Sequence, residues 1–314
     1  MTKRTLKIGT RGSKLALYQA YKVKEAIEEI LTDITPEIVI INSKGDKILD
    51  VALSKIGDKG LFTKELEEAL LRGEVDVAVH SLKDVPTHLP EGLIIGGVLP
   101  RGDVRDALIS SKSIKLEDLT KRNDLVIATS SLRRTAHLLR LNPDLNIKDI
   151  RGNVNTRVKK MEDGYCDVML MAAAGLQRLE MDEYISDTLD PEVVIPAVSQ
   201  GAIAIQTREN DNFVSSVINQ INHEQTFLAT RAERIFLRML EGGCQIPIGC
   251  YSKINGDNFS IKGFLSYIDG TEIIEETLTG KLEDADQLAE KLANIFIKAG
   301  APEILARIRK ANKS

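Results

Sequence analysis

The stretch EVDVAVHSLKDVP, residues 74–86, predicts a short buried strand that ends in a polar turn. Residues 75–79 are almost continuously apolar, a pattern typical of a parallel strand that is covered on both faces. Side chains just past the carboxyl end of such a strand face the crevice in which open α/β sheets bind ligands. Asp84 is therefore the candidate central acid, although the local sequence leaves open that it only caps a turn before Pro86.

The size and composition of the chain restrict its class. With 314 residues, of which 43% are hydrophobic and 28% charged, it is long enough for two or three domains. It shows neither a secretory signal nor an apolar run long enough to cross a membrane, so we expect a cytoplasmic protein. Its three cysteines include no CxxC pair. The net charge of −4 argues against a nucleic-acid partner, so any anion site must come from local clusters of basic residues.

The start of the chain predicts a candidate anion site. Residues 6–9 predict a strand, and the turn TRGS at residues 10–13 leads into a helix whose N-terminus, with Arg11 and Ser13 beside it, suits an anion. Further on, the lysine-rich segment 43–60 is either a functional lid or a solvated linker, and the sequence leaves both open.

The second half of the chain repeats the first. Both IGTRGSKLAL (residues 8–17) and IATSSLRRTAHL (residues 127–138) predict a strand, a Thr/Ser turn and a helix start. Both RGEVDVAVHS (residues 72–81) and DGYCDVMLMA (residues 163–172) place Asp-Val at the start of a buried strand. We therefore predict two similar α/β lobes, and chance convergence of short strand and helix patterns is the alternative.

Arginines gather at the strand ends and helix entries of the second lobe. A planar guanidinium can pair bidentately with a carboxylate, and a hydrogen bond between charged groups contributes about 1.5–3 kcal/mol. Each arginine alone could be an ordinary surface charge, but the group favours a polyanionic ligand. Its members are Arg133, Arg134, Arg151, Arg157 and Arg178.

The last hundred residues or so predict a small α+β domain. A helix capped at Thr226 comes first. Residues 251–278 then alternate like three antiparallel strands, and two amphipathic helices follow near 284–299 and 302–311.

Cys244 differs from the other two cysteines. Two glycines precede it and Pro247 follows, so it lies on a tight loop where a thiol can be a nucleophile or an attachment point. Cys166 and Cys250 belong to apolar strands and predict core positions. His80 is the one histidine at the predicted crevice, and no pattern links it to Cys244, so covalent attachment is favoured over hydrolysis.

The chain carries, in order, six motifs that together resemble those of the porphobilinogen deaminase family: TRGSKLAL, HSLKDVP, ATSSLRR, RGNVNTR, AAAGLQRL and EGGCQIPIG. The resemblance covers nearly the whole chain. It implies an α/β fold of two periplasmic-binding-protein-like lobes with a hinge, plus a small α+β C-terminal domain. The implied domains are residues 1–99 with 200–218, residues 100–199, and residues 219–314, the last of which carries the cofactor cysteine.

The same resemblance implies a transferase, hydroxymethylbilane synthase. Such an enzyme joins four porphobilinogen molecules head to tail into the linear tetrapyrrole hydroxymethylbilane, with release of ammonia, in haem, chlorophyll and corrin biosynthesis. Its dipyrromethane cofactor would be attached covalently to Cys244 through a thioether. The substrate is the small molecule porphobilinogen, and we expect a monomer with no nucleic-acid, membrane or metal partner.

The resemblance also assigns residues. Asp84 matches the catalytic aspartate, expected to be a buried carboxylate that stabilises positive charge as ammonia leaves. The cofactor-binding positions fall on Asp84, Lys83, Thr129, Ser130, Ser131, Arg133, Arg134 and Cys244. The substrate-binding positions fall on Arg11, Ser13, Gln19, Lys55, Phe62, Arg151, Arg157, Arg178 and Gln200.

Two other functions use the same residues differently. A non-catalytic two-lobed anion-binding module would explain the arginines, but neither Cys244 nor the turn at Asp84. A cysteine-dependent hydrolase would explain Cys244, but it lacks a placed histidine.

Overall fold

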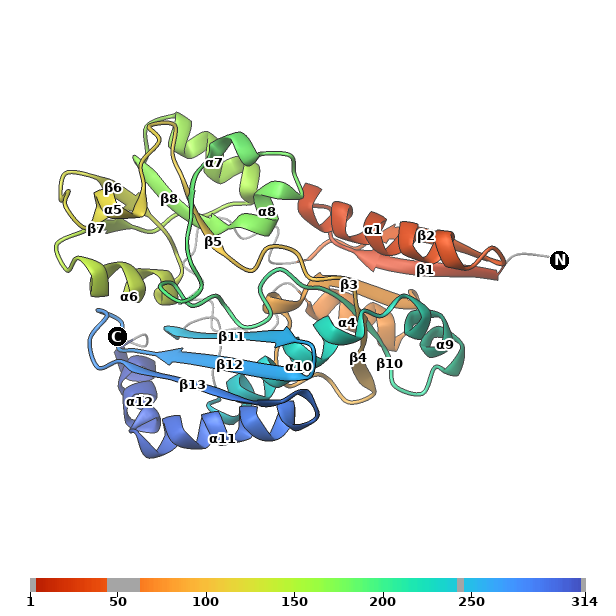
Figure 1. The fold of residues 1–314 in the computed structure, drawn as a ribbon. Helices are drawn as coiled ribbons and strands as arrows, with labels where there is room; N and C mark the ends of the chain where they lie inside the picture. Colours follow the sequence, from red (N-terminus) through yellow and green to blue (C-terminus); the bar gives the residue numbers. More distant parts are fainter. Residues whose placement is uncertain (1–3, 44–62, 242–245, 312–314) are drawn as a thin grey trace. The chain divides into compact units, whose positions relative to one another are not determined.

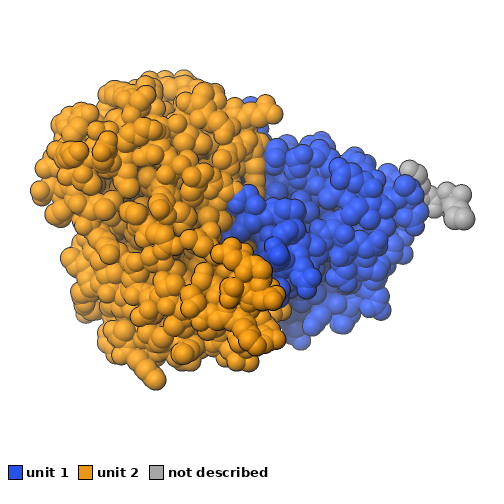
Figure 2. All heavy atoms as spheres, viewed as in Figure 1, with its two compact units in different colours: residues 1–49, 58–102, 201–228 blue, residues 50–57, 103–200, 229–314 orange. Residues whose placement is uncertain are grey.

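A computed structural model describes residues 4–43, 63–241 and 246–311 of the chain (Figure 1). The described strands form two sheets of five strands and one of three. The chain divides into two compact units, which Figure 2 colours separately. Unit 1 comprises residues 1–49, 58–102 and 201–228, and unit 2 comprises residues 50–57, 103–200 and 229–314. Within the described ranges, no helix is long and apolar enough to cross a membrane.

The sheet of unit 1 has the strand order β2-β1-β3-β10-β4. Its first three strands are parallel, while β10 runs antiparallel to both of its neighbours, β3 and β4. Helices α1, α4 and α9 belong to the same unit. The bounds of these elements are β1 Arg4–Thr10, α1 Lys14–Ile30, β2 Ile34–Ile40, α4 Lys64–Leu71, β3 Val77–Ser81, β4 Leu93–Val98, β10 Ile203–Arg208 and α9 Asn212–Ile221.

Strand β3 is buried on both faces, as its apolar run predicts. Val77 and Val79 pack in a cluster with residues of α1 and α9, whereas Ala78 packs in another cluster with residues of α4. Successive side chains of a strand point to opposite faces, so the two clusters lie on opposite sides of the sheet. The prediction of a parallel strand is right toward β1 and wrong toward β10, where antiparallel pairing sets Ala204 opposite His80.

The first sheet of unit 2 repeats this topology, with the order β7-β6-β8-β5-β9. Strands β6, β7 and β8 are parallel, and β5 runs antiparallel to β8 and β9. Strand β6 therefore corresponds to β1, and β8 to β3, which are the pairs that the two sequence repeats align. The predicted pair of similar α/β lobes is confirmed. The bounds are β5 Asp106–Ile109, α5 Leu116–Leu119, β6 Val126–Ala128, α6 Leu132–Leu141, β7 Asn146–Lys148, α7 Val154–Glu162, β8 Val168–Ala172, α8 Ala173–Gln177, η2 Asp182–Tyr184 and β9 Ile185–Thr188.

The C-terminal part of unit 2 is an antiparallel sheet, β11-β12-β13, whose core it shares with α10, α11 and α12. Phe236 of α10 and Phe296 of α11 meet edge to face, with ring centroids 5.0 Å apart. Gly263 of β12 lies against both rings, because a Cβ there would come within 2.8 Å of Phe236. The three predicted strands and two terminal helices are confirmed, and with the two lobes they confirm the fold class. The bounds are α10 Glu224–Met239, β11 Ile248–Asn255, β12 Asn258–Leu265, β13 Ile274–Lys281, η3 Leu282–Asp284, α11 Ala285–Lys298 and α12 Ala301–Ala311.

The predicted cap of α10 is wrong. The helix begins at Glu224 rather than after Thr226. Nδ1 of His223 accepts the N–H of Thr226 at 3.2 Å and lies 2.8 Å from its hydroxyl oxygen, so an imidazole nitrogen satisfies one main-chain donor of the first turn. The predicted division of the chain into three domains stays a prediction.

Candidate active site

Asp84 lies in η1 (Leu82–Asp84), a short turn that directly follows β3. Leu82 and Val85 are buried, and the N–H of Leu82 donates to the carbonyl of Ala202 at 3.0 Å, so the turn is held firmly on both sides of Asp84. The side chain of Asp84 is exposed, and the expectation of a buried carboxylate is wrong, because Leu82 and Val85 occupy the inward positions. Within the described residues no hydrogen bond reaches this carboxylate, and the turn closes through the main chain, so a capping role has no support.

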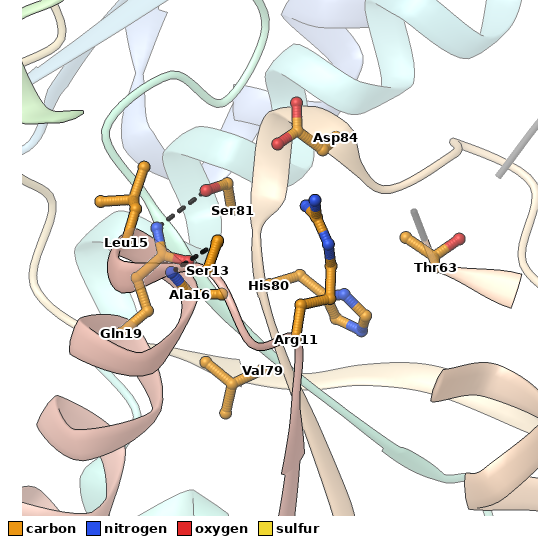
Figure 3. Close-up of a pocket in the computed structure, with 10 residues that line it drawn as sticks. All are labelled: Arg11, Ser13, Leu15, Ala16, Gln19, Thr63, Val79, His80, Ser81 and Asp84. Atoms are coloured by element: carbon orange, nitrogen blue, oxygen red, sulfur yellow. Dashed lines mark hydrogen bonds between the residues drawn. The ribbon is translucent and has the colours of Figure 1, made fainter. Parts of the chain in front are cut away.

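Asp84 shares a pocket with three other predicted site residues, Arg11, Ser13 and Gln19 (Figure 3). Ser13 caps α1, since its hydroxyl accepts an N–H of the first turn at 3.3 Å. Gln19 is 2% exposed, and its Nε2 donates to Oγ of Ser81 at 2.8 Å, which fixes the start of α1 against the end of β3. Figure 3 shows the guanidinium of Arg11 directed toward the turn that carries Asp84. The pocket thus offers a carboxylate, a guanidinium and hydroxyl groups, which suits a ligand with cationic and anionic parts.

A hydrogen-bonded row of three buried polar residues, none of them among the predicted site residues, reaches the same pocket. His80 of β3 lines the pocket, and its Nε2 lies 3.0 Å from Oε1 of Gln206 in β10. Nε2 of Gln206 donates to Oε1 of Glu67 in α4 at 3.2 Å. Burial, helped by the charge of Arg11 and opposed by the hydrogen bond to Gln206, lowers the pKa of His80 to about 4. Burial also raises the pKa of Glu67. For His80 and Gln206 the signal in the sequence was a polar residue within an apolar strand.

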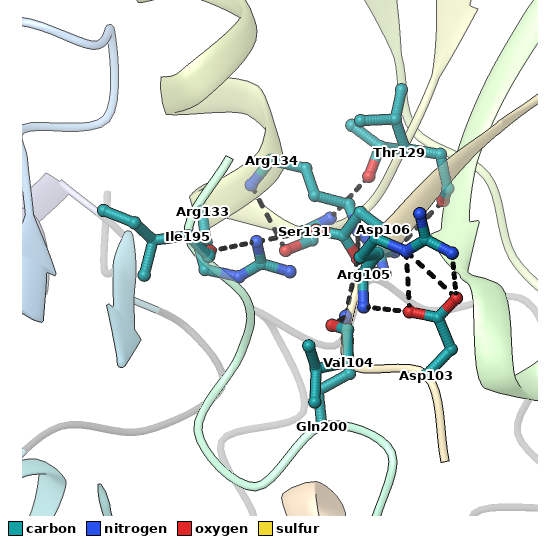
Figure 4. A network of polar contacts seen from close by, with 11 residues as sticks. Asp103, Val104, Arg105, Asp106, Thr129, Ser131, Arg133, Arg134, Ile195 and Gln200 are labelled. Carbon is teal, nitrogen blue, oxygen red and sulfur yellow. Dashed lines mark hydrogen bonds and ion pairs between the residues drawn. The ribbon is translucent and has the colours of Figure 1, made fainter. Parts of the chain in front are cut away.

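A second group of predicted residues surrounds Asp106, the first residue of β5 in unit 2 (Figure 4). Arg133 and Arg134 lie in the first turn of α6, which Ser131 caps by accepting the N–H of Arg134 at 3.4 Å. Each of the two guanidiniums donates to a carboxylate oxygen of Asp106 at 2.7 Å. Nε2 of Gln200 donates to the same carboxylate at 2.9 Å. The arginines, Asp106 and Gln200 are all buried.

Asp106 is the centre of this cluster, and its place there is not evident from the sequence, because the segment RGDVRD (residues 101–106) looks like a charged turn. Burial by itself would raise the pKa of Asp106, but the adjacent guanidiniums outweigh burial and hold the pKa far below its usual range. One carboxylate faces two guanidiniums, so the cluster keeps one excess positive charge. Main-chain carbonyls of Ile195 and Leu170 accept further N–H groups from the arginines, which holds both side chains in place.

The other predicted residues of unit 2 lie at turns and helix ends. The hydroxyl of Thr129 accepts an N–H of its own turn at 3.2 Å, and that of Ser130 hydrogen-bonds the main chain just before Arg151. Nε of Arg151 lies 3.5 Å from a carboxylate oxygen of Asp149. Nε of Arg157 donates to the carbonyl of Gly152 at 2.7 Å. The contact of Ser130 with Ile150 ties the turn after β6 to the loop before α7.

Arg178 ends α8, and Lys83 lies half-buried in η1 beside Asp84. Three predicted residues, Lys55, Phe62 and Cys244, lie outside the described residues, as do residues 44–60 of the lysine-rich segment.

The two described cysteines are buried, as predicted, although Cys166 precedes β8 rather than lying in it. Burial raises the pKa of the Cys166 thiol to about 11. Among the described residues, no cluster of His, Cys, Asp and Glu could hold a metal ion.

Two family models match the chain. The model described as "Porphobilinogen deaminase, dipyromethane cofactor binding domain" matches residues 6–216. The model described as "Porphobilinogen deaminase, C-terminal domain" matches residues 227–298.

Curated relatives match at nearly full length. The chain is 46% identical, over 98% of its length, to the whole of a protein from Syntrophomonas wolfei named porphobilinogen deaminase. It is 45% identical, over 99% of its length and 99% of the relative, to one of the same name from Chloroherpeton thalassium. Among solved structures, the methionine-binding protein MetQ is 12% identical, with a TM-score of 0.45 over 73% of this chain and 94% of that chain.

Proposed function

This chain belongs to the porphobilinogen deaminase family, and from that premise we propose how its residues divide the work of the reaction. It is a transferase, a hydroxymethylbilane synthase, that joins four porphobilinogen molecules head to tail in tetrapyrrole biosynthesis. At each condensation a carbon–carbon bond forms between pyrrole units, the C–N bond of an aminomethyl group breaks, and ammonia and a pyrrole-ring proton leave.

Asp84 is the central acid of this proposal. When the C–N bond breaks, positive charge develops on the pyrrole that loses ammonia, and a fixed carboxylate stabilises that charge. The same carboxylate can accept pyrrole N–H groups and take up the departing proton. The single observation that carries the assignment is the position of Asp84: its side chain projects from a rigid turn at the end of β3 into a pocket that it shares with Arg11, Ser13 and Gln19.

The arginines bind the carboxylates of the substrate. Each porphobilinogen carries an acetate and a propionate, so every condensation adds two negative charges, and a guanidinium can pair bidentately with each group. Arg11 serves the pocket in unit 1 with Ser13 and Gln19. In unit 2 we assign this role to Arg151, Arg157 and Arg178, and the predicted contact of Gln200 with the substrate stays a prediction.

The cofactor of this family is dipyrromethane, and the residues present suit it. The cluster around Asp106 keeps one excess positive charge in buried surroundings, which fits a group that bears acetates and propionates. We assign its binding to Arg133 and Arg134, with Thr129, Ser130 and Ser131 in the adjoining turn, and its thioether to Cys244. Once bound, the dipyrromethane supplies the primer that the enzyme extends. The predicted contributions of Lys83 and Asp84 to holding it stay predictions.

The intact mass of the protein, purified from cells that make porphobilinogen, tests this proposal. We expect the mass of the chain plus a covalent dipyrromethane. The adduct should be lost in Cys244→Ser and kept in Cys166→Ala, whose buried thiol has no such role. An unmodified wild-type mass would contradict the proposal.

We also propose that the protein is a cytoplasmic monomer without a nucleic-acid partner. The net charge of −4 supports the last point. Light scattering tests the monomer, and a mass of twice the chain would contradict it.

A further inference from the structure

His80 is a buried polar residue of the Asp84 pocket that the mechanism above leaves without a role. Its side chain and those of Gln206 and Glu67 come from β3, β10 and α4, and they are 6%, 0% and 7% exposed. Burying polar groups is unfavourable unless they are hydrogen-bonded, and these three bond one another in sequence.

The order of donors and acceptors along these three residues fixes the tautomer of His80. A carboxylate only accepts hydrogen bonds, so Gln206 turns its NH₂ group toward Glu67 and its carbonyl oxygen toward His80. That oxygen also only accepts, so Nε2 of His80 must carry the hydrogen. Nδ1 of the neutral imidazole then keeps a lone pair, and within the described residues it has no hydrogen-bond partner.

This lone pair gives the pocket a second acceptor beside the carboxylate of Asp84, whereas Arg11 offers only donors. Porphobilinogen brings N–H donors, one on its pyrrole ring and others on its aminomethyl group. The low pKa of His80, about 4, leaves its ring uncharged at neutral pH, so Nδ1 stays free to accept.

We propose that Glu67 and Gln206 hold His80 in the Nε2–H tautomer, so that Nδ1 accepts a hydrogen bond from an N–H group of porphobilinogen. This inference rests on the proposed function. His80 is then a substrate-binding residue. Glu67 and Gln206 are positioning residues that act through it.

Two variants separate binding from structure, because each keeps one half of the imidazole. In His80→Gln the side-chain NH₂ can replace Nε2 and still donate to Gln206, but nothing replaces Nδ1. In His80→Asn the side-chain oxygen can replace Nδ1, but the contact with Gln206 is lost. We expect kcat/KM for porphobilinogen to fall about tenfold in His80→Gln with little change in Tm, the size of effect expected for one hydrogen bond. His80→Asn should have a lower Tm and the higher kcat/KM of the two.

The reverse result, normal kcat/KM in His80→Gln and impaired kcat/KM in His80→Asn, would overturn the inference, because it is what a purely structural histidine predicts. If the wild type is active and the kcat/KM of His80→Gln equals that of the wild type, only this inference is rejected. Wild type that releases no ammonia from porphobilinogen overturns the proposed function and this inference with it.

A measurement that does not depend on activity completes the test. Nitrogen-15 NMR of the wild-type histidine rings should show a hydrogen on Nε2 of His80 and none on Nδ1, with the ring signals assigned through their correlations to the main chain of His80. In Gln206→Met, which removes the acceptor, this preference should be lost. A hydrogen on Nδ1 in the wild type would overturn the inference, even if neither His80 variant folds.

Discussion

Replacing Asp106 with asparagine should destabilise the protein strongly. The carboxylate is fully buried and accepts N–H groups from Arg133, Arg134 and Gln200. Asparagine removes the charge and one acceptor oxygen, and its NH₂ group faces the guanidiniums. Breaking a buried ion pair by removing one partner costs about 3–5 kcal/mol. Since each kcal/mol lowers the Tm of a unit of this size by about 2–4 °C, we expect a fall of roughly 6–20 °C.

Scanning calorimetry of wild type, Asp106→Asn and a surface control measures this fall. The control is Asp124→Asn, whose carboxylate pairs with Arg122 at 2.6 Å but is 67% exposed, so no measurable change is expected. A fall of less than about 2 °C in Asp106→Asn would refute the counterion argument.

The contribution of Asp106 to the free energy of unfolding also depends on pH, in one direction. Because the pKa of Asp106 is lower in the folded chain, the unfolded chain protonates first, and this stabilisation is lost as the pH falls below about 4.

Three further predictions concern buried groups. Burial holds the pKa of His80 at about 4 and that of His137 at about 3, so below pH 6.5 the unfolded chain takes up protons first. The free energy of unfolding should then fall by up to about 1.4 kcal/mol per histidine for each pH unit down to about pH 4, and His137→Phe should reduce the slope measured by denaturant titration. A flat profile would contradict this. Gly263→Ala should destabilise by about 1–3 kcal/mol, because its Cβ would overlap the Phe236 ring, and an unchanged midpoint would show that the ring yields. Cys166 should resist alkylation in the folded protein at mildly alkaline pH, because its pKa is raised to about 11, and rapid labelling seen by mass spectrometry would argue against that burial.

Local patterns were enough to predict the fold class, though not the antiparallel pairing of β3 with β10. The apolar run of β3 and the polar turn after it are neighbours in sequence, and the two aligned repeats predicted that β8 corresponds to β3. The same patterns located Asp84, because a turn after a buried strand is visible in a few residues. They could not tell which way its side chain points. That depends on Leu82 and Val85, which take the inward positions.

Pairings between distant residues could not be predicted in the same way. Asp106 stands 27 positions from Arg133, and its own segment looks like a charged turn. Glu67 and Gln206 stand 139 positions apart. No local periodicity signals that such polar groups share a buried site, because each one alone fits an exposed or capping position equally well.

Ammonia release from porphobilinogen by Asp84→Ala tests the central claim most directly. The variant should keep the Tm of the wild type, because the side chain is exposed and makes no hydrogen bond within the described residues. Its turnover should fall at least about a hundredfold, since the carboxylate that stabilises charge and moves a proton is gone. Asp84→Glu, which restores a carboxylate, should recover part of the rate. Turnover of Asp84→Ala within a few-fold of wild type would contradict the assignment of Asp84 as the central acid.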